Sequence, residues 1–288
     1  MKHYFSYASI ALALFLCTLI YFTCIKRTKG FCYTKIHSRY DYDYRWDFGP
    51  PTKSQEDLLD QIADQPFTLL GSGKECYAFV SADGNIIVKF FKQKHMRIQY
   101  LLNYLPILQT IQALRSETLN RHRVRRKALY QSYQIAYEHL PEETGVLYLH
   151  LSKTKSLNRT IHLKTPKGKN LTLKLDDMEF LVQKRAYSIF DEMKAHPDKS
   201  KEMISSILYL IAERNRKGIG DNDINCERNL GILDGKALQI DVGEFYPSIP
   251  KSVNKEELKR ATLDLQCFLE ENQPELVSYL QEEVNALL

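Results

Sequence analysis

Residues Lys217 to Phe245 read KGIGDNDINCERNLGILDGKALQIDVGEF, and the rest of the chain is best interpreted from this segment. A helix is predicted to end near Gly218, because glycine often follows a last helical turn. A cluster of acidic and amide side chains comes next, followed by two short apolar segments joined by Asp234-Gly235. Asp-Gly between apolar segments indicates a β-hairpin. Such a hairpin would bring the polar residues that precede it close to the Asp241-Val242-Gly243 sequence at its end.

This order of features resembles the catalytic core of the protein-kinase-like superfamily. The typical sequence there is G-I-[VI]-H-[RG]-D, then an Asn within a few residues, then a hairpin that ends in D-F-G. Asp223 falls on the catalytic-loop Asp, Asn229 on the metal-binding Asn, and Asp241 on the Asp of D-x-G. Phosphoryl transfer needs hard oxygen ligands for a divalent metal and a carboxylate near the attacking hydroxyl. The resemblance therefore implies ATP and magnesium as cofactors, with Asn229 and Asp241 as metal ligands and Asp223 as the catalytic carboxylate.

The match departs from the family pattern in several places. Asp221 and Asn222 stand where the family has His-Arg, and Val242 replaces Phe. Asn229 lies six positions after Asp223, where the family usually has five. Asp221 is therefore retained as an alternative catalytic carboxylate for a shifted loop. A pseudokinase that acts as a binding or scaffold module is the alternative to an enzyme.

Two other interpretations compete for the same residues. Asp221, Asp223 and Asn225 have the 1, 3, 5 spacing of a calcium-binding loop, but Cys226 stands where Gly is needed and Ile232 where Glu is needed. The calcium interpretation is set aside. The plain structural alternative is a polar turn between a helix and a hairpin, because Asp and Asn favour turns whatever the function.

A second part of the chain also resembles a kinase. Residues 67–79 read FTLLGSGKECYAF, which predicts two strands around a Gly71-Ser72-Gly73 turn, and residues 86–91 predict a third strand that carries Lys89. In the superfamily a Gly-rich hairpin covers the nucleotide phosphates, and a lysine on the next strand holds them. The resemblance therefore implies that Gly71, Ser72, Gly73 and Lys89 bind the nucleotide. Cys76 stands where a third glycine is expected.

The sequence around this turn excludes a Walker loop. Gly73-Lys74 is followed by Glu75 instead of Ser or Thr, and Thr68 stands where the first glycine should be. Gly hairpin, strand lysine, catalytic-type Asp, Asn and D-x-G occur in the superfamily order, and this order supports a kinase-like fold more than any single motif does.

Residues 92–140 read as helical and basic. In the family a helix at this place supplies a Glu that pairs with the strand lysine, so Glu138 is the candidate and Glu117 the alternative. Six basic residues lie between Arg115 and Lys127. They form either a solvated helix face or a contact with anionic lipid.

The first residues predict a membrane anchor. Tyr4 to Ile25 is apolar and uncharged over 22 residues, which is long enough to cross a bilayer as a helix. A cleaved signal peptide is the alternative, but this run is longer than a signal and lacks small residues before a cleavage site. We predict a single-pass membrane protein with residues 1–29 as the anchor and 30–53 as a juxtamembrane linker. Basic residues after the run favour a cytoplasmic body.

The remaining chain can form two small lobes, since 44% of its residues are hydrophobic and 26% are charged. Ser54 is predicted to cap a helix over 56–63. Strands are predicted over 146–151, 160–163 and 170–175, and helices from Asp176 or Asp177 through Met193, over 200–216, from Asn254 to about Glu271, and from Pro274 onward. The predicted lobes are 54–175 and 176–288. The net charge of +5 permits an anionic partner such as nucleotide and indicates no specific nucleic acid.

The sequence therefore predicts an α+β, two-lobed protein-kinase-like fold with a small antiparallel sheet lobe, a reduced helical lobe and one transmembrane helix. The expected activity is ATP- and magnesium-dependent transfer of a phosphoryl group to a hydroxyl. No A-P-E-like sequence follows Gly243 and only 45 residues remain, so a non-protein acceptor is expected. The third hypothesis, after an enzyme and a pseudokinase, is an unrelated membrane-tethered structural protein that would bind no nucleotide.

Overall fold

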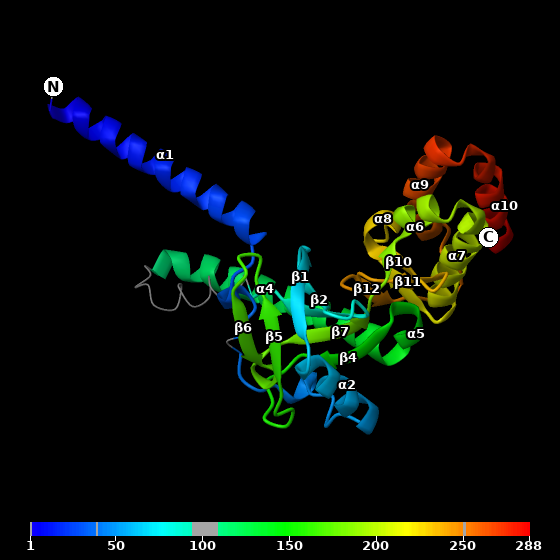
Figure 1. The fold of residues 1–288 in the computed structure, drawn as a ribbon, viewed down its shortest axis with the longest axis horizontal. Helices are drawn as coiled ribbons and strands as arrows, with labels where there is room; N and C mark the ends of the chain where they lie inside the picture. The colour runs from blue at the N-terminus through cyan, green and yellow to red at the C-terminus, as the bar shows by residue number, and fades with distance from the viewer. Residues whose placement is uncertain (1, 39, 94–108, 250–251) are drawn as a thin grey trace. The chain divides into compact units, whose positions relative to one another are not determined.

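The computed structural model describes residues 2–38, 40–93, 109–249 and 252–288 (Figure 1). The chain divides into two compact units. The first comprises Met1–Arg97 and Ser152–Phe180, and the second comprises Ile98–Leu151 and Leu181–Leu288.

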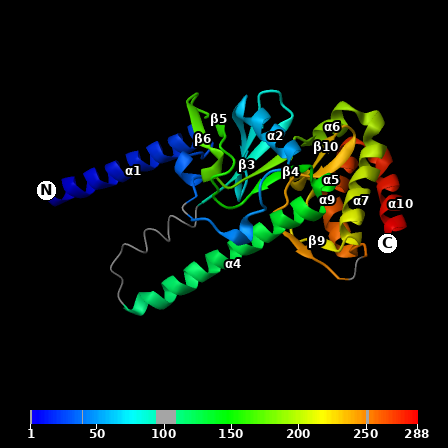
Figure 2. The same cartoon turned by 90° about the horizontal axis from the view of Figure 1, so that it is seen from below.

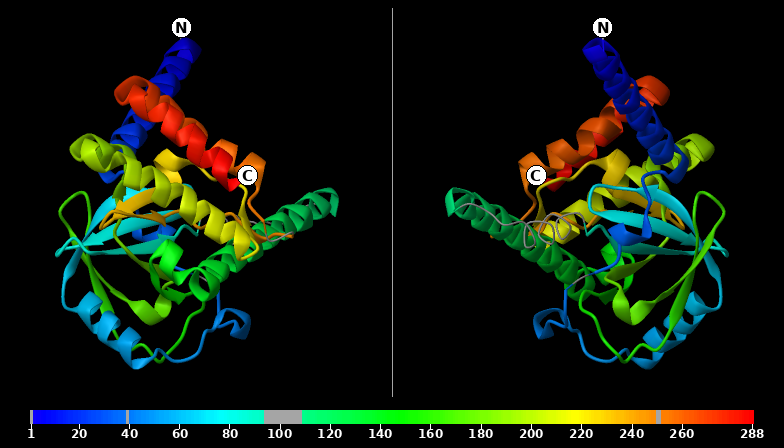
Figure 3. Two further views of the ribbon diagram at one scale, coloured as in Figure 1. Left: turned by 90° about the vertical axis from the view of Figure 1, so that its right-hand side faces the viewer. Right: turned by 90° about the vertical axis from the view of Figure 1, so that its left-hand side faces the viewer.

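The first unit consists of helices and a β-sheet. Its elements are α1 (Lys2–Thr28), the 3-10 turns η1 (Tyr33–Lys35) and η2 (Tyr44–Trp46), α2 (Lys53–Ala63), β1 (Pro66–Ser72), β2 (Cys76–Ser81), β3 (Ile86–Phe91), β5 (Thr160–Lys164), β6 (Asn170–Lys174) and the 3-10 turn η3 (Leu175–Asp177). The strand order within this unit is β3-β2-β1-β5-β6. β1, β2 and β3 pair antiparallel in sequence order, as predicted, and β5 pairs parallel to β1. Figure 3 shows α2 beside this sheet, where it packs on β5.

Aromatic side chains fill much of the core of the first unit. Phe79 on β2 and Phe90 on β3 have ring centroids 5.8 Å apart, and Phe31 and Phe180 extend this cluster on either side. β3 is buried along nearly its whole length because both of its faces are apolar, and Lys89 is its one half-buried position. The embedded lysine predicted from the sequence is therefore partly withdrawn from water.

The described residues of the predicted linker, 30–38 and 40–53, belong to the first unit. Trp46 is buried, and the Ser38 hydroxyl donates to Glu179 Oε1 over 2.7 Å. α2 begins one turn earlier than predicted, because Thr52 and Gln55 form its capping box, with the Thr52 amide donating to Gln55 Oε1 over 2.9 Å. The predicted cap, Ser54, lies inside the helix.

The apolar N-terminal run forms a helix, α1, as expected. Within the part of the chain that the structure describes, however, no helix is both long enough and apolar enough to cross a membrane. The predicted transmembrane helix therefore finds no support.

The second unit is mostly helical. Its elements are α4 (Gln109–His139), α5 (Pro141–Thr144), β4 (Val146–His150), β7 (Phe180–Lys184), β8 (Tyr187–Ser188), α6 (Ile189–Ala195), the 3-10 turn η4 (Pro197–Lys199), α7 (Ser200–Arg216), β9 (Ile219–Asp221), α8 (Cys226–Asn229), β10 (Leu230–Leu233), β11 (Lys236–Gln239), β12 (Phe245–Pro247), α9 (Lys255–Asn272), the 3-10 turn η5 (Pro274–Leu276) and α10 (Val277–Leu287). β7 begins at the last residue of the first unit. Two small antiparallel sheets, β11-β10-β8 and β12-β9, lie within this unit.

The predicted helix from Asp176 or Asp177 through Met193 is wrong. The chain instead forms β7 and β8 before the short helix α6. The Asp176 carboxylate caps a loop of the first unit, where it accepts hydrogen bonds from the Thr154 hydroxyl and the Leu157 and Asn158 amides. This loop contact uses the side chain that the sequence assigned to a helix N-terminus.

The predicted helices over 200–216 and after Asn254 are confirmed. Asn254 caps α9 by accepting from the Glu256 and Glu257 amides, both over 3.1 Å. α7, α9 and α10 surround one apolar core, which also includes Leu230 and Ile232 of β10 (Figure 1). This core fixes the loop between α7 and β10, which carries the candidate site.

α4 is the long helix of the second unit (Figure 2). Part of the segment predicted as helical from Lys92, residues 94–108, lies outside the described residues. The C-terminal half of α4 buries Tyr130, Tyr133, Ala136 and, just after the helix, Leu140, whereas Gln131 and Glu138 are exposed. α4 packs on β4 and β12.

Candidate active site

The backbones of the two predicted metal ligands, Asn229 and Asp241, are in contact in the second unit. The backbone carbonyl of Asn229 accepts hydrogen bonds from the amides of Ile240 (2.8 Å) and Asp241 (3.2 Å). β10 and β11 pair from Leu230 with Gln239 to Leu233 with Lys236, so the hairpin returns the chain to its starting point. The expected meeting of Asn229 with Asp241 is therefore present in the structure.

Asp223 is tied to the same place. The Asn229 side-chain amide, Nδ2, donates to the Asp223 carbonyl. This bond uses the nitrogen of the amide and leaves Oδ1 as the atom that can coordinate a cation. The carboxylates of Asp223 and Asp241 are both exposed. The buried Asn229 thus contacts the backbone of both exposed carboxylate residues at one end of the β10–β11 hairpin.

Asp221 has different surroundings. Its side chain is buried, with Oδ1 accepting from the Asp223 amide over 2.9 Å and Oδ2 accepting from the Gln239 side-chain amide. The guanidinium of Arg214, on α7, lies 3.1 Å from Oδ2. Burial raises the pKa of Asp221 above its ordinary value, and Arg214 opposes that shift. The buried Asp221 carboxylate therefore holds the loop through hydrogen bonds, whereas Asp223 is exposed to solvent.

A buried ion-pair network supports the loop. Arg214 is 1% exposed and also pairs with Glu257, a fully buried carboxylate on α9. Burial raises the pKa of Glu257, and Arg214 again opposes the shift. Glu257 Oε2 accepts from the Asp221 amide over 3.3 Å, and Asn215 donates to both of its oxygens. Burying one cation with two carboxylates has a high desolvation cost. In return, the Glu257 carboxylate fixes the loop backbone through the Asp221 amide.

One face of α9 contacts the loop at three successive points. Glu257, Arg260 and Asp264 are spaced i, i+3 and i+7, which places them on the same side of a helix. Arg260 donates to the carbonyls of Asp221 and Asn222 over 3.4 Å, and Asp264 accepts from the Asn225 side chain. One face of α9 therefore holds the catalytic-type loop in place through these hydrogen bonds.

α4 holds the D-V-G segment from another side. The Ser132 hydroxyl donates to the Val242 carbonyl over 2.5 Å and accepts from the Phe245 amide over 2.6 Å. A side chain at Gly243 would lie 3.4 Å from Leu129 of the same helix. The position of Asp241 is thus linked to the position of α4.

Sequence reasoning missed these supporting residues, although a signal was present. Arg214 continues the apolar stripe of α7, at the i+3 and i+7 spacing from Ile211 and Ile207. Glu257 sits beside Leu258 on the face of α9 that is otherwise buried. A charged residue on an apolar helix face indicates a buried ion pair, since an unpaired buried charge is too costly.

The Gly-rich hairpin lies in the first unit. The strand register shifts between Leu69 and Gly71, and the Gly73 amide donates to the Cys76 carbonyl over 3.0 Å to close the turn. Among the residues that the structure describes, no atom lies within 4 Å of a Cβ built on Gly71, and at Gly73 the contact is with the Cys76 carbonyl oxygen at 4.0 Å. Packing within the chain therefore gives no reason for glycine at these two positions, whereas close approach of a ligand to the backbone would.

Lys92, which the sequence did not single out, contacts the tip of this hairpin. Its ammonium group donates to the Ser72 hydroxyl over 2.8 Å and to the Gly73 carbonyl, and it lies 4.4 Å from the Tyr77 ring centre. Lys89 pairs in register with Ala78 of the neighbouring strand β2. Two lysines of this part of the chain are thus associated with the Gly-rich hairpin and its strands.

The remaining predicted residues lie on α4. Glu138 is exposed near the end of the helix, where it accepts from the Gln134 side chain over 2.9 Å. In the basic run Arg115–Lys127, Arg121 pairs with Glu117 over 3.1 Å, and Arg123, Arg125 and Lys127 are exposed.

The oxygen donors present fit a magnesium ion whose remaining ligands come from nucleotide phosphates and water. Among the described residues, no group of three or more His, Cys, Asp or Glu side chains could hold a metal. Magnesium is often held by one or two carboxylates plus substrate phosphates and water. One carboxylate at Asp241 and one amide oxygen at Asn229 match that incomplete protein shell.

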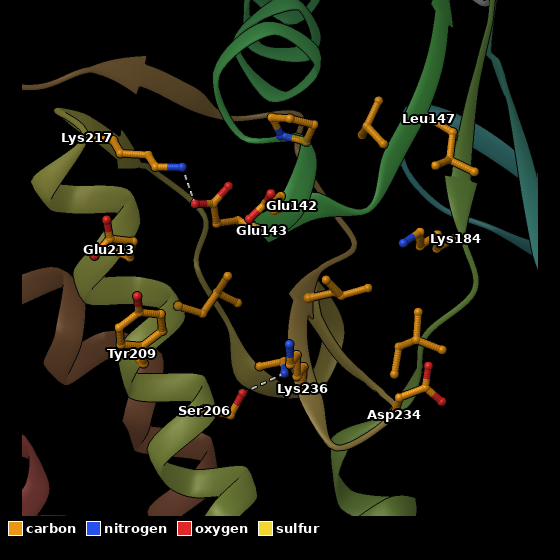
Figure 4. Close-up of a pocket in the computed structure, with 16 residues that line it drawn as sticks. Glu142, Glu143, Leu147, Lys184, Ser206, Tyr209, Glu213, Lys217, Asp234 and Lys236 are labelled. Atoms are coloured by element: carbon orange, nitrogen blue, oxygen red, sulfur yellow. Dashed lines mark hydrogen bonds and ion pairs between the residues drawn. The ribbon is translucent and has the colours of Figure 1, made fainter. Parts of the chain in front are cut away.

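A separate pocket of about 940 Å³ lies elsewhere in the second unit (Figure 4). Its lining includes Leu210, Leu238 and the ion pair of Lys217 with Glu143. None of the predicted site residues lines it.

Comparisons with known proteins give structural neighbours only. No protein-family model matches the sequence, and no curated protein matches it either. Among solved structures, the chain is similar to Rv3197 from Mycobacterium tuberculosis in complex with erythromycin, at 14% identity and a TM-score of 0.32, over 81% of this chain and 60% of that one. It is also similar to the bifunctional kinase-methyltransferase WbdD, at 14% identity and a TM-score of 0.36, over 73% of this chain and 43% of that one.

A third similar structure is the ternary complex of APH(2'')-IIa with streptomycin and ATP. The identity is 11% and the TM-score 0.31, over 80% of this chain and 88% of that one. The chain spans less than two thirds of the length of the Rv3197 and WbdD structures. TM-scores this low carry no information about the role of the site residues. In motif order and in the elements that carry those motifs, the chain resembles the protein-kinase-like superfamily.

Proposed function

We propose that this protein is a kinase-like phosphotransferase that uses ATP and magnesium to phosphorylate a hydroxyl group. The observation that carries the proposal is the Asn229 carbonyl, which accepts the Asp241 amide and so sets the two predicted metal ligands together. Phosphoryl transfer depends mostly on positioning and on neutralising charge, so the adjacency of such ligands matters more than any single residue.

Each candidate residue has a proposed role. Asn229 Oδ1 and the Asp241 carboxylate would hold magnesium, which when bound neutralises charge on the phosphates. Asp223 would orient the acceptor hydroxyl and accept its proton. Asp221 is a positioning residue, because its buried carboxylate already accepts two hydrogen bonds and pairs with Arg214.

The nucleotide-binding roles belong to the first unit. The backbone of Gly71, Ser72 and Gly73 would approach the phosphates, and Lys89 would bind them. The free space for a side chain at Gly71 supports this role, because glycine there is not required by packing.

The proposed acceptor is a small molecule. In protein kinases a long activation segment ending in A-P-E follows D-F-G. Here residues 244–254 alone separate Gly243 from α9, which leaves little chain to support a peptide substrate.

Nucleotide binding is tested by thermal unfolding of the full chain with and without magnesium-ATP. A ligand that binds only the folded state raises the melting temperature. We expect a rise in the wild type that Lys89→Ala and Asp241→Ala abolish. Lys164→Ala and Asp198→Ala, which change exposed residues outside the site, should keep the rise. Absence of a rise in the wild type at saturating nucleotide would overturn the proposal.

A pseudokinase is the second candidate function, and the replacement of His-Arg by Asp221-Asn222 and of Phe by Val242 favours it. Formation of ADP from ATP in the presence of monosaccharides, polyols, sugar phosphates and nucleosides separates the two. For an enzyme, Asp223→Asn should abolish transfer to the acceptor that is found and retain the thermal response to ATP. Binding of ATP without transfer to any acceptor class would favour the pseudokinase.

A further inference from the structure

The segment that contains the β5–β6 hairpin carries basic residues and no acidic ones. Residues 153–174 contain seven Lys and Arg residues and no Asp or Glu, whereas the whole chain has a net charge of only +5. All other residues together therefore carry a net charge of −2. An accumulation of one sign on one element creates a local field that attracts oppositely charged partners.

The fold sorts this hairpin into an apolar face and a basic face. β5 and β6 lie side by side and pair antiparallel (Figure 1). Ile161, Leu163 and Leu173 are buried. Lys164 and Lys174 are exposed on the alternate positions. Lys167 and Lys169 are exposed in the turn. We call these four lysines the lysine face.

The turn that carries two of these lysines is well defined. The Thr165 amide donates to the Lys169 carbonyl over 2.9 Å, and the Gly168 amide donates to the Thr165 carbonyl over 2.8 Å. The Lys169 amide donates to the Thr165 hydroxyl over 3.0 Å, and Gly168 has a φ of +77°. The lysine face is therefore presented on an ordered hairpin. None of its four side chains forms an ion pair with any residue that the structure describes.

β6 also offers an open backbone edge. It is the last strand in the sheet order, so among the described residues one of its two edges has no strand partner. An edge strand of this kind can accept an extended segment as an added strand, with main-chain hydrogen bonds giving affinity and side chains giving specificity. Lysines on an edge strand deter pairing between like copies. An acidic segment is instead attracted by the lysines, because its carboxylates carry the opposite charge.

We propose that the β5–β6 hairpin docks an extended, acidic polypeptide segment of a partner protein, which adds to the edge of β6 with its carboxylates against the lysine face. Two independent features, the open edge and the unpaired lysines, fit this occupant. Nucleic acid fits less well, because residues 153–174 contain no Phe, Tyr or Trp for base stacking and their single arginine, Arg159, is paired with Asp60 over 2.6 Å. A membrane fits less well because the turn 166–169 has no large apolar side chain to insert.

The test measures binding of a fluorescent peptide of about ten residues, in which Glu alternates with Val or Thr, to the full chain by anisotropy. The same peptide with all of its backbone amides methylated keeps its charge but has no backbone N–H to donate from either edge, so it cannot pair as a regular strand. The quadruple variant K164Q/K167Q/K169Q/K174Q removes the lysine face. The matched control, R123Q/K127Q/K255Q/K259Q, removes the same charge from exposed residues of α4 and α9.

We expect binding that weakens with salt and falls about tenfold or more for the methylated peptide and for the quadruple variant, but not for the control variant. Equal losses in both variants would reduce the effect to overall charge and overturn the proposal. It would also be overturned if duplex DNA, duplex RNA or vesicles containing phosphatidylserine bound more tightly than the peptide and depended on the same four lysines. Thermal unfolding checks that both variants remain folded. Nucleotide binding is not a readout here, so either proposal can fail alone.

Discussion

At the scale of single residues, the site depends on side chains that do not themselves reach solvent. Asp223 and Asp241 are exposed, yet their positions are set by Arg214, Glu257 and Ser132, all of which are buried. Removing a buried partner leaves another buried group unsatisfied, which costs more than the net value of the hydrogen bond. Variants of the supporting residues should therefore change stability, and variants of the exposed carboxylates should change ligand response.

Glu257→Gln tests the buried carboxylate through pH. Burial raises the folded-state pKa of Glu257 above its ordinary value of 4.5. As pH rises from about 4.5, the unfolded chain loses this proton first, so stability is lost until the folded state also ionises. The wild type should therefore lose stability relative to Glu257→Gln as pH increases through this window, as measured by melting temperature against pH. Glu256→Gln, an exposed neighbour, should follow the wild type; a wild type that gains on Glu257→Gln with rising pH would contradict the assignment.

Ser132→Ala tests the contact between α4 and the D-V-G segment. The substitution leaves the buried Phe245 amide without the acceptor that lies 2.6 Å away. We expect a loss of about 1–3 kcal/mol in the free energy of unfolding, measured by urea denaturation. Gln131→Ala, at an exposed position on the same helix, should change it by less than about 0.5 kcal/mol. Equal effects of the two substitutions would show that the Ser132 contacts contribute nothing specific.

At the scale of elements, the sequence predicted helices and hairpins correctly where a single local pattern determines the element. The Asn254 cap, the apolar stripe of α7 and the Asp-Gly hairpin each gave the right element, because each has a local cause. The helix predicted from Asp176 failed because a capping residue and a loop-closing residue look alike in sequence. Asp176 accepts from Thr154, 22 positions earlier, and no local pattern records such a partner. The apolar residues after it are buried as β7, since a short apolar run is compatible with either a strand or a helix.

The candidate site shows the same division. The adjacency of Asn229 and Asp241 could be predicted because a hairpin is a local structure that returns its ends to one place, whereas their role as metal ligands stays a prediction. The Arg214–Glu257 pair spans 43 positions and was missed. Its signal, a charge on each of two apolar helix faces, becomes informative only once the two helices are known to be neighbours.

Gly231→Ala tests the β10 strand, whose geometry carries Asn229 toward Asp241. A Cβ at this position would lie 2.8 Å from the Ala186 Cβ and 2.9 Å from the Tyr187 carbonyl oxygen. Backbone cannot move aside as a side-chain end can, so we expect a loss of about 1–3 kcal/mol by urea denaturation. Gly71→Ala, where the added Cβ meets nothing within 4 Å, is the control and should keep wild-type stability. A tolerated Gly231→Ala would mean that β8 and β10 separate easily.

At the scale of the whole molecule, the protein contributes an incomplete metal shell, so metal and nucleotide binding should depend on each other. One carboxylate and one amide oxygen are too few ligands for tight binding of free magnesium, which usually retains several waters. Magnesium alone should therefore leave the melting temperature nearly unchanged. Magnesium with ATP at about a hundred times the dissociation constant should stabilise the folded state by about 2.7 kcal/mol.

Chelation by EDTA separates the metal contribution from that of the nucleotide. We expect EDTA to remove most of the ATP-dependent rise in melting temperature in the wild type. In Asn229→Ala, the smaller response to ATP should be the same with and without EDTA, because the substitution removes the amide oxygen proposed to bind the metal. Asn272→Ala, which alters an amide that donates to the Phe268 carbonyl within α9, should respond as the wild type does. A wild-type response that survives EDTA unchanged would mean that the nucleotide binds without metal, and the roles proposed for Asn229 and Asp241 would then be lost together.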